Sequence, residues 1–384
     1  GKIDTMKIGG TFQGISSAGK GVLEFTGTST NRRTLEINRN LEVDVDGRIN
    51  SSSIAASGRR DTLIVNGKIW NYSDGNPAYD GGIYLNQGND DYVILKFSGS
   101  ESSTVTGEGN WGNPLTEVHL KKNDGLLDTL NCLSNSFAAA TGTDPFLFHF
   151  LGGVLALNKS SSTLSLPDAT FTLSSGTQEV TMYPESGINV LHGVMKTKQT
   201  LNTNVLTTIN VDNGGILEVG DAQDEHLLYQ TGTKVSVLDG IIDIAGCFDK
   251  LSYKYVVDCN VGNKGIIRVL NKGNTDITRK GFNISNESST FSMDGGRVII
   301  AKSSNSSSND YEVSSGYGLG MINGATVQIG DSILAPPAQN YKIAGTTPMF
   351  NLHYVGNSIT QITQQNLYIN NDWTIDNNHE AEVY

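Results

Sequence analysis

Cysteine is nearly absent from this sequence, which excludes a disulfide-rich scaffold. The 384 residues include only Cys132, Cys247 and Cys259, at spacings that match no metal-binding motif. Cys247 and Cys259 could form a disulfide. Two buried free thiols are the better-supported alternative, because a chain of this length can bury a sizeable core without cross-links.

Long apolar runs and an excess of basic residues are also missing. No stretch approaches 18 consecutive apolar residues, so no membrane-spanning helix is predicted, and no signal peptide is recognisable at Gly1. The 39 acidic and 27 basic residues give a net charge of −12, which disfavours nucleic acids and anionic membrane surfaces as partners. The 44 glycines show no three-residue period, and branched aliphatic residues are too frequent for a disordered chain.

One short pattern recurs along most of the chain: an apolar residue, Asp or Asn, Gly, and then a run that alternates apolar and polar residues. Clear copies are VDVDGRIN at 43–50, LIVNGKIW at 63–70, VDNGGILEV at 211–219, VLDGIIDI at 237–244, VGNKGIIRV at 261–269, MDGGRVII at 293–300 and INGATVQI at 322–329. The glycines before the strands, looser copies included, stand at positions 47, 67, 153, 193, 215, 240, 265, 296 and 324. The close steps between them are 20, 22, 25, 25, 31 and 28 residues, which is a period typical of stacked repeats.

This repeat predicts an all-β fold, a right-handed parallel β-helix (β-solenoid) with roughly 20–30 residues per coil. One coil of short strands cannot bury its inward face, whereas stacked coils bury a continuous column. We expect one elongated β-solenoid over residues 1–345. Residues 346–384 lack the Asp/Asn-Gly mark, and we expect them to be a strand-rich continuation or the start of a further module.

The period-two alternation also predicts which side chains point into the column. Ile242 and Ile299 are expected to point inward, whereas Asp224 and Glu225 are expected to lie on the surface, where charge changes cost little.

A helical pattern occurs only in GLLDTLNCLSNSFAAA at 125–140. Its apolar residues would share one helical face, and they are Leu126, Leu127, Leu130, Leu133 and Phe137. We expect a helical excursion from the solenoid there.

The residue before the repeat glycine is the most regular polar feature of the chain. The positions are Asp46, Asn66, Asn213, Asp239, Asp294 and Asn323. A row of carboxylates could bind Ca²⁺. Half of these residues are Asn, however, and Asn, Asp and Gly all suit tight corners, which favours a structural turn ladder.

A polysaccharide-cleaving β-helix needs carboxylates together with a basic residue on neighbouring coils of one face. Two clusters in the sequence meet that requirement, one made of Asp44 and Asp46 near Arg32, Arg33, Arg39 and Arg48, and one made of Asp221, Asp224, Glu225 and His226. Both clusters lie beside turns, where exposed charge is ordinary. We therefore predict no catalytic residues.

Other catalytic and cofactor motifs have no support. The six histidines (119, 149, 192, 226, 353 and 379) form neither HxH nor HExxH, so no metal site is predicted. The GDSI sequence at 330–333 faintly resembles the nucleophile block of GDSL esterases, but no partner block accompanies it. No nucleotide- or cofactor-binding fingerprint occurs, and Lys and Arg are dispersed.

Clustered aromatic residues indicate a surface that could stack on sugars. One group is Trp70, Tyr72 and Tyr79, and a second is Tyr311, Tyr317 and Tyr341. Scattered aromatic residues on a surface also occur without function.

Three segments resemble a repeat unit of large secreted surface proteins of Bacteroidota. They are DYVILKFSGSESSTVTGEGN at 91–110 followed by LTEVHLKKN at 115–123, GVLEFTGTSTNRRTLEINRNLEVDVDGRIN at 21–50, and MFNLHYVGNSITQITQQNLYINNDWTI at 349–375. The style of repeat is shared with autotransporter and haemagglutinin-type β-helices. The resemblance implies an extracellular, adhesin-like cell-surface protein exported by the type IX secretion system, although we recognise no secretion tail domain in these residues and expect a mature chain or a fragment.

We therefore expect a segment of a large bacterial cell-surface protein that acts as a stalk or an adhesive surface. The expected partners are surface polysaccharide, another cell-surface protein, and the secretion machinery during export, with no cofactor, nucleic acid or membrane insertion. The alternatives are a polysaccharide-active β-helix enzyme (lyase or glycoside hydrolase) and a phage-type receptor-binding fibre.

The same resemblance implies O-glycosylation at Asp-Ser/Thr followed by a small or aliphatic residue. Four positions match, namely Thr5, Thr62, Thr129 and Ser332. Thr62 and Ser332 are preferred because their preceding aspartates are expected at loops beside repeat strands, where a bulky glycan can be solvated.

Overall fold

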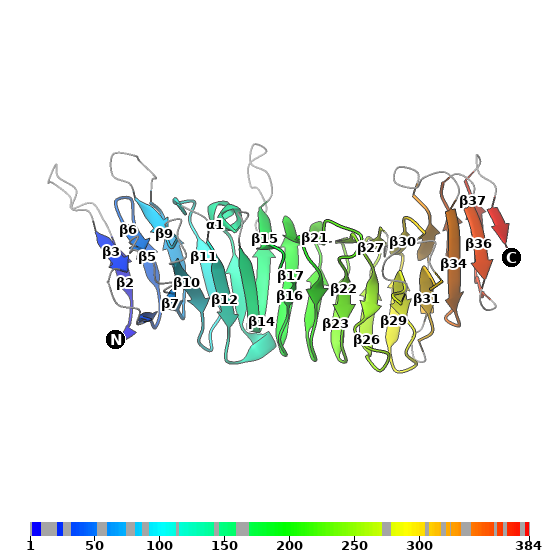
Figure 1. Ribbon diagram of the computed structural model, residues 1–384, viewed down its shortest axis with the longest axis horizontal. Coiled ribbons are helices and arrows are strands. Elements are labelled where there is room, and N and C mark those ends of the chain that lie inside the picture. Colours follow the sequence, from blue (N-terminus) through cyan, green and yellow to red (C-terminus); the bar gives the residue numbers. More distant parts are fainter. Residues whose placement is uncertain are drawn as a thin grey trace. The chain divides into compact units, whose positions relative to one another are not determined.

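The computed structural model describes residues 2–8, 21–25, 32–51, 60–73, 81–86, 92–112, 115–141, 146–158, 169–270, 278–303, 307–315, 320–322, 324–331, 339–356, 359–363, 367–376 and 381–383. Over these residues the chain is all-β with large parallel sheets (Figure 1). The contacts divide it into two compact units. Unit 1 is Gly1–Gln178 with Glu185–Ile188, and unit 2 is Glu179–Pro184 with Asn189–Tyr384.

Unit 1 contains three parallel sheets, which we call 1A, 1B and 1C. Sheet 1A is β1 (Lys2–Ile3), β4 (Thr34–Ile37), β7 (Arg60–Val65), β10 (Tyr92–Phe97), β12 (Glu117–Lys121) and the start of β14 (Leu147–Asn158). Sheet 1B is β2 (Met6–Ile8), β5 (Leu41–Val43), β8 (Ile69–Asn71), β11 (Ser103–Thr106), β13 (Thr129–Cys132) and the end of β14. Sheet 1C is β3 (Val22–Phe25), β6 (Arg48–Ser51) and β9 (Gly82–Tyr84), and β15 (Thr170–Ser174) pairs antiparallel with β14.

Unit 2 also contains three parallel sheets, called 2A, 2B and 2C. Sheet 2A is β18 (Val194–Thr197), β21 (Gly215–Val219), β24 (Gly240–Ile244), β27 (Ile266–Val269), β30 (Arg297–Ile300), β33 (Thr326–Ile329), β35 (Asn351–Tyr354) and β37 (Trp373–Ile375). Sheet 2B is β20 (Thr208–Val211), β23 (Thr233–Val237), β26 (Val257–Val261), β29 (Thr290–Asp294) and β32 (Gly320–Ile322). Sheet 2C is β16 (Val180–Thr181), β19 (Leu201–Asn202), β22 (Leu227–Tyr229), β25 (Phe248–Lys250), β28 (Phe282–Ile284), β31 (Tyr311–Val313), β34 (Gln339–Gly345), β36 (Ile359–Thr363) and β38 (Ala381–Val383), while β17 (Ser186–His192) begins in unit 1 and ends in unit 2.

The strand register of sheet 2A follows the spacing of the glycines in the sequence. Gly215 pairs with Gly240, 25 residues later, and the Ile241–Ile266 pair has the same step. The next pair, Ile266 and Arg297, has a step of 31 residues. The Asp/Asn-Gly pattern therefore marks the entry to five of the strands of sheet 2A, namely β21, β24, β27, β30 and β33.

The first step of the sequence pattern, from Gly47 to Gly67, does not connect equivalent positions. Gly47 leads into β6 of sheet 1C, whereas Gly67 precedes β8 of sheet 1B. Both corners need the same turn chemistry, so the motif alone does not distinguish them.

The corner glycines of sheet 2A lie against the backbone of the preceding repeat. A Cβ atom at Gly240 would lie 2.5 Å from the carbonyl oxygen of Gly215, and one at Gly265 would lie 1.9 Å from that of Val237. Such distances are too short for a side chain, so close approach of two backbones requires glycine at these corners.

The core consists of rows of apolar side chains from paired strands. Leu217, Ile242 and Ile267 follow one another in sheet 2A, and all three are fully buried. In sheet 2C, the ring of Phe282 stacks on Phe248 and on Tyr311, with centroids 5.1 and 5.8 Å apart. Parallel register brings like side chains together, and the rows bury them from water.

Ile242 lies in the inward row as expected, whereas Ile299 is also buried but does not belong to that row. Ile299 pairs with Arg268 and with Gln328, so it belongs to the outward row of sheet 2A, and its neighbour Val298 takes the inward position. The run RVII of β30 is apolar at three successive residues, so alternation could not show which of them points inward.

The segment expected to be one amphipathic helix is divided into three elements. It forms a 3₁₀ turn η1 (Gly125–Leu127), strand β13, and a short helix α1 (Asn135–Ala140). Ser134 caps α1 by accepting a hydrogen bond from the Phe137 amide. Strand pairing of β13 with β11 and β14 outweighs the helical spacing of the leucines, and Leu127 is exposed.

Parallel pairing continues through residues 346–384. Strand β35 pairs with β33, and β37 pairs with β35, while β36 and β38 extend sheet 2C. Within the described part of the chain, no helix has the length and apolar character needed to cross a membrane.

The three cysteines are buried and carry free thiols. Burial raises the pKa of the Cys259 thiol well above its ordinary value, and the Asp258 charge adds to the shift.

Ile242→Asp is expected to destabilise the protein by several kcal/mol, because it places an unpaired charge in an apolar row. Ile241→Asp is the matched control, since Ile241 is the preceding residue of the same strand and lies half-buried in the outward row. We expect the control to cost about 1 kcal/mol, several-fold less than Ile242→Asp. Urea unfolding midpoints measure both, and equal losses for the two variants would contradict the register described above.

Candidate metal centre

Two side chains that can bind a metal ion lie on the same face of one strand of unit 1. Glu117 and His119 are two residues apart on β12, so their side chains point to the same side of the sheet. Val118 and Leu120 alternate with them and are fully buried. Glu117 and His119 therefore project outward from sheet 1A.

The third side chain comes from the neighbouring strand. In the parallel register of β12 and β14, His119 is paired with His149. The two imidazole rings lie edge to face, with centroids 4.6 Å apart. Residues 30 positions apart in the sequence thus become direct neighbours.

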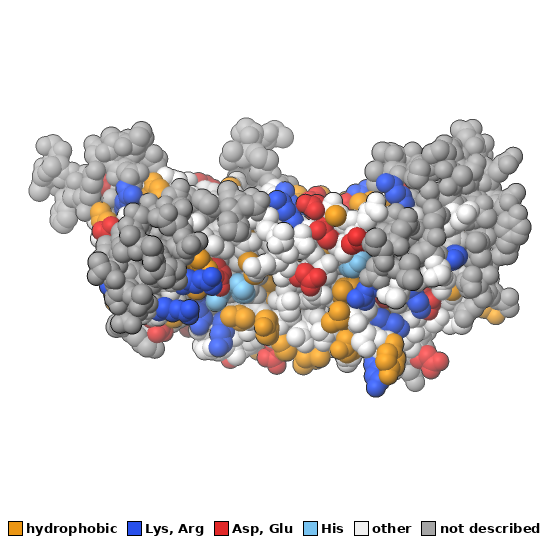
Figure 2. Space-filling model, in the orientation of Figure 1, with side chains coloured by type: hydrophobic (Ala, Val, Ile, Leu, Met, Phe, Trp, Pro, Cys, Tyr) orange, Lys and Arg blue, Asp and Glu red, His pale blue; other side chains and the backbone are white. Residues whose placement is uncertain are grey.

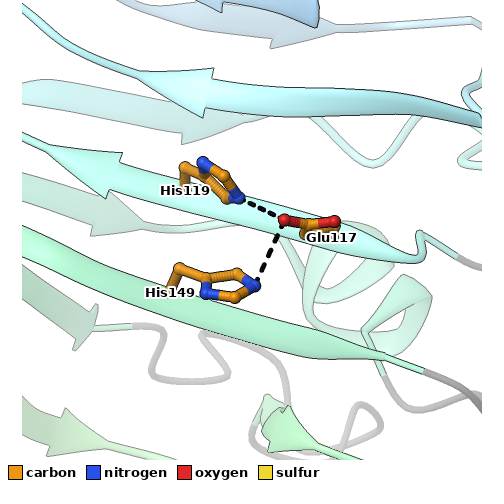
Figure 3. Close-up of side chains that lie close together, drawn as sticks. All are labelled: Glu117, His119 and His149. Carbon is orange, nitrogen blue, oxygen red and sulfur yellow. Dashed lines mark hydrogen bonds and ion pairs between the residues drawn. The ribbon is translucent and has the colours of Figure 1, made fainter. Parts of the chain in front are cut away.

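Both imidazoles point at the same carboxylate oxygen (Figure 3). The Nε2 atom of His119 lies 2.5 Å from Glu117 Oε1, and the Nε2 atom of His149 lies 3.2 Å from it. The ligand atoms of the three residues all lie within 4.8 Å of one another.

The other carboxylate oxygen is held from strands β10 and β7. The Tyr92 hydroxyl donates a hydrogen bond of 2.6 Å to Glu117 Oε2, and Arg60 Nη1 lies 3.9 Å from the same oxygen. The Arg60 guanidinium also lies over the Tyr92 ring, 5.2 Å from its centroid. These contacts fix the orientation of the carboxylate and leave Oε1 directed at the histidines.

Burial by itself would raise the pKa of the Glu117 carboxyl, but hydrogen bonds from His119, His149 and Tyr92 outweigh it. The pKa therefore lies well below its ordinary value. Burial raises the pKa of the Tyr92 hydroxyl far above its usual range, and its bond to Glu117 adds to that shift. Glu117 is therefore an anion and Tyr92 a neutral donor at neutral pH.

The cluster is accessible from solvent. The side chains of Glu117, His119 and His149 are 13%, 21% and 32% exposed. Figure 2 shows histidine side chains at the surface in the region of β12 and β14, with Lys and Arg side chains close by. Two imidazole nitrogens and one carboxylate oxygen form a donor set that binds divalent transition metals in proteins.

This site could not be recognised in the sequence, because its residues are divided between two strands. Glu-x-His on β12 is too short to be a motif, and His149 joins it only through the β12–β14 register. The expectation of scattered histidines is wrong for His119 and His149, which lie side by side.

The first carboxylate cluster considered from the sequence is not assembled as a catalytic group. Asp44 forms an ion pair with Lys7 at 3.2 Å, and Asp46 is buried. Arg39 lies 3.4 Å from Asp4, and the Arg48 guanidinium lies over the Tyr84 ring. Arg32 and Arg33 are exposed.

The second cluster is a turn rather than a surface charge group. Glu225 Oε2 accepts hydrogen bonds from the amides of Asp221 and Ala222, at 2.5 and 2.7 Å. His226 is buried, and its Nδ1 accepts a hydrogen bond from the Cys247 amide. Asp224 is exposed as expected, but the surface assignment of Glu225 is wrong, because its carboxylate organises the turn after β21.

Unit 2 contains a polar network that sequence reasoning missed. Asp249 in β25 is buried and accepts hydrogen bonds from Asn283 Nδ2 and from the amides of Lys250 and Lys280. Burial raises its pKa in spite of these bonds. Lys280 also pairs with Glu312 at 2.5 Å. Because donors within the fold occupy its carboxylate, Asp249 stabilises sheet 2C and is not free to act on a substrate.

The turn residues lie at the corners of the repeats. Asn213 has a φ of 50°, a conformation that Asn tolerates, and Asp239 pairs with Lys264 at 3.0 Å. Asn66 donates to Glu36, and Asp294 is exposed at the end of β29. Asp46 is buried at its turn. Asn323 lies outside the described residues.

The aromatic residues separate into exposed and buried ones. Tyr72 is 52% exposed, and Trp70 is half-buried in β8, with the Lys68 ammonium 5.9 Å from its ring centroid. Tyr311 and Tyr341 are buried core residues. The prediction that they belong to a second aromatic surface is therefore wrong. Tyr79 and Tyr317 lie outside the described residues.

The Ser/Thr positions considered for glycosylation differ in their surroundings. Thr5 is exposed, whereas Thr62 is half-buried on the outward side of β7. Asp61 lies within β7 and is buried, with its Oδ1 accepting from the Arg33 amide, so it is not a loop residue as expected. Thr129 begins β13 rather than lying in a helix. Ser332 lies outside the described residues.

Comparison with known proteins gives no match, whether the sequence is compared with family models and curated proteins or the fold with solved structures.

A buried lysine lies directly after β12. The Lys122 ammonium donates to the backbone oxygens of Ser98 and Glu101, at 2.8 and 2.7 Å, and to the Ser103 hydroxyl at 2.5 Å. Its side chain is almost fully buried. Burial lowers the pKa of Lys122 to about 8, against the opposing influence of Asp128 and Glu101.

Lys122→Met is expected to cost about 2–4 kcal/mol at pH 7, because it leaves buried acceptors without a donor. Between pH 8 and 10.5, the unfolded chain retains the Lys122 proton while the folded protein loses it. The unfolding free energy of the wild type should therefore rise relative to the variant over this window, by roughly 1–3 kcal/mol. Denaturation series at several pH values measure the difference, and a flat or falling difference would show that Lys122 is not desolvated.

Proposed function

We propose that this chain is a right-handed parallel β-helix that forms part of a large bacterial cell-surface protein, where it serves as a stalk or adhesive surface. The observation that carries the proposal is the strand register. In each unit, strands of the parallel sheets recur in order, and paired residues of neighbouring strands lie 20–36 residues apart in the sequence. Right-handed crossovers are strongly preferred between parallel strands, which supports the handedness.

The side chains on the outward sides of the sheets are arranged in regular rows, which suits a surface that binds a partner. In sheet 2A, Asp243 pairs with Arg268 in an ion pair on one outward row, so neighbouring repeats place charged groups side by side at strand spacing. Such a surface offers regularly spaced polar contacts, and the exposed Tyr72 beside Trp70 adds an aromatic contact for sugars. Surface polysaccharide or another cell-surface protein is the proposed partner.

The proposal predicts that the chain is outside the cell in its source bacterium. An antibody against the chain should label intact cells, and protease added to intact cells should remove the signal while a cytoplasmic protein survives. A signal that appears only after lysis would rule out the cell-surface assignment.

A second experiment incubates the purified chain with neutral and acidic polysaccharides and measures both binding and cleavage. We expect binding without release of reducing ends or unsaturated sugars. Turnover that is lost on Glu117→Gln, or on Asp44→Asn with Asp46→Asn, would establish the polysaccharide-active enzyme in place of the adhesin.

O-glycosylation is proposed at the four Asp-Ser/Thr sites, with Thr62 and Ser332 preferred. The Thr62 side chain is on the outward side of β7, so a glycan there can extend into solvent without displacing the core. Intact-mass measurement of protein from the native host should show hexose-scale increments that Thr62→Ala and Ser332→Ala remove. A mass equal to that of the bare chain would contradict glycosylation.

A further inference from the structure

We propose that Glu117, His119 and His149 bind one divalent transition-metal ion of the Zn²⁺ class on the outward side of sheet 1A. The three donor atoms are already gathered, within 4.8 Å of one another, and come from two adjacent strands whose register is fixed by hydrogen bonds. This site is independent of the function proposed above.

The geometry needs only small side-chain movements to accept the ion. Donor atoms about 2.0–2.2 Å from a tetrahedral Zn²⁺ lie about 3.3 Å from one another. Glu117 Oε1 and His149 Nε2 are already 3.2 Å apart, whereas Oε1 and His119 Nε2 are 2.5 Å apart and must separate by about 1 Å. Because the imidazoles are partly exposed, this requires ring rotation and no change in the strands.

The neighbours of the cluster fit the supporting arrangement seen around protein-bound metals. The Tyr92 hydroxyl holds Glu117 Oε2 at 2.6 Å, so the oxygen directed at the histidines is the one that would bind the ion. Hydrogen bonds of this kind orient metal-binding carboxylates. Three protein ligands leave a fourth position open toward solvent, where a water molecule completes the tetrahedron.

The donor set also decides which ion is favoured. Ca²⁺ and Mg²⁺ prefer oxygen ligands alone, whereas imidazole nitrogen selects Zn²⁺, Cu²⁺, Ni²⁺ and Co²⁺.

Two positively charged side chains near the site weaken the binding of a cation by electrostatic repulsion. Arg60 lies near Glu117 Oε2, and Lys96 is paired with His119 in the register of β10 and β12.

Bound metal would connect two repeats of unit 1. His149 is contributed by β14 and the other two ligands by β12, so the ion would add metal–ligand bonds between strands already joined by backbone hydrogen bonds, packing and the Glu117–His149 contact. A metal that binds only the folded state stabilises it by an amount that grows with the logarithm of the free metal concentration, so the unfolding temperature should rise as Zn²⁺ is added.

The test uses the 384-residue chain without a polyhistidine tag, stripped of metal with a chelator. Zn²⁺ competed against a chromophoric chelator should bind with a stoichiometry of one per chain. Glu117→Gln, His119→Gln and His149→Gln should each weaken binding at least tenfold, and Tyr92→Phe about tenfold. Lys96→Gln should tighten it about threefold, because it removes a nearby positive charge.

The matched control is His353→Gln. His353 pairs with Asp376 at 2.9 Å, a histidine–carboxylate pair that has no third ligand among the residues described. Its Zn²⁺ affinity should equal that of the wild type, and circular dichroism should show that every variant is folded.

Co²⁺ gives an independent readout on the wild-type protein. An intense visible absorption band that Zn²⁺ displaces would report tetrahedral coordination, and it should be lost in His149→Gln. Absence of saturable Zn²⁺ binding by the wild type would overturn the proposal and leave a hydrogen-bonded triad. Unchanged affinity in all three ligand variants would overturn it as well.

Discussion

Parallel register is the constraint on which the rest of this structure depends. When a strand pairs in register with its counterpart about 25 residues later, side chains of the same row lie side by side. Apolar rows such as Leu217, Ile242 and Ile267 then bury each other, and polar rows remain in solvent. A shift of one residue would exchange the two sets, so burial of the core fixes the register.

The fold could be predicted from the sequence wherever a repeat carries both its glycine corner and clean alternation. That is why the steps from Gly193 to Gly296 agree with the strand pairs of sheet 2A. The prediction was wrong where local patterns are ambiguous. An apolar run of three residues concealed the outward position of Ile299, and leucines with helical spacing belong partly to strand β13. In both cases pairing between strands, which is not local, decided the outcome.

The candidate site could not be predicted, because its parts become recognisable only after the register is known. Glu117 and His119 look like two ordinary polar residues of an alternating strand, and His149 looks like a third from another repeat. Of the two clusters that the sequence did indicate, the contiguous one contains Glu225 and His226. Glu225 binds amides of its own turn, and His226 accepts from the Cys247 amide of the next repeat. In stacked parallel strands of this kind, residues that pair across neighbouring strands are better candidates for a shared binding or catalytic site than residues adjacent in the sequence.

The glycine corners of sheet 2A also determine which changes this chain can accumulate. Because a Cβ at Gly240 or Gly265 would overlap a carbonyl oxygen of the preceding repeat, a point substitution there disturbs two repeats at once. Residues inserted between one strand and the next disturb neither. Both effects are visible in this sequence. Paired residues of neighbouring strands in sheet 2A are 22, 25 or 31 residues apart, so the length of the repeat varies, whereas the corner residue is glycine each time. Divergence of such a chain should proceed by the lengthening of loops, and similarity searches that penalise gaps will lose its relatives early.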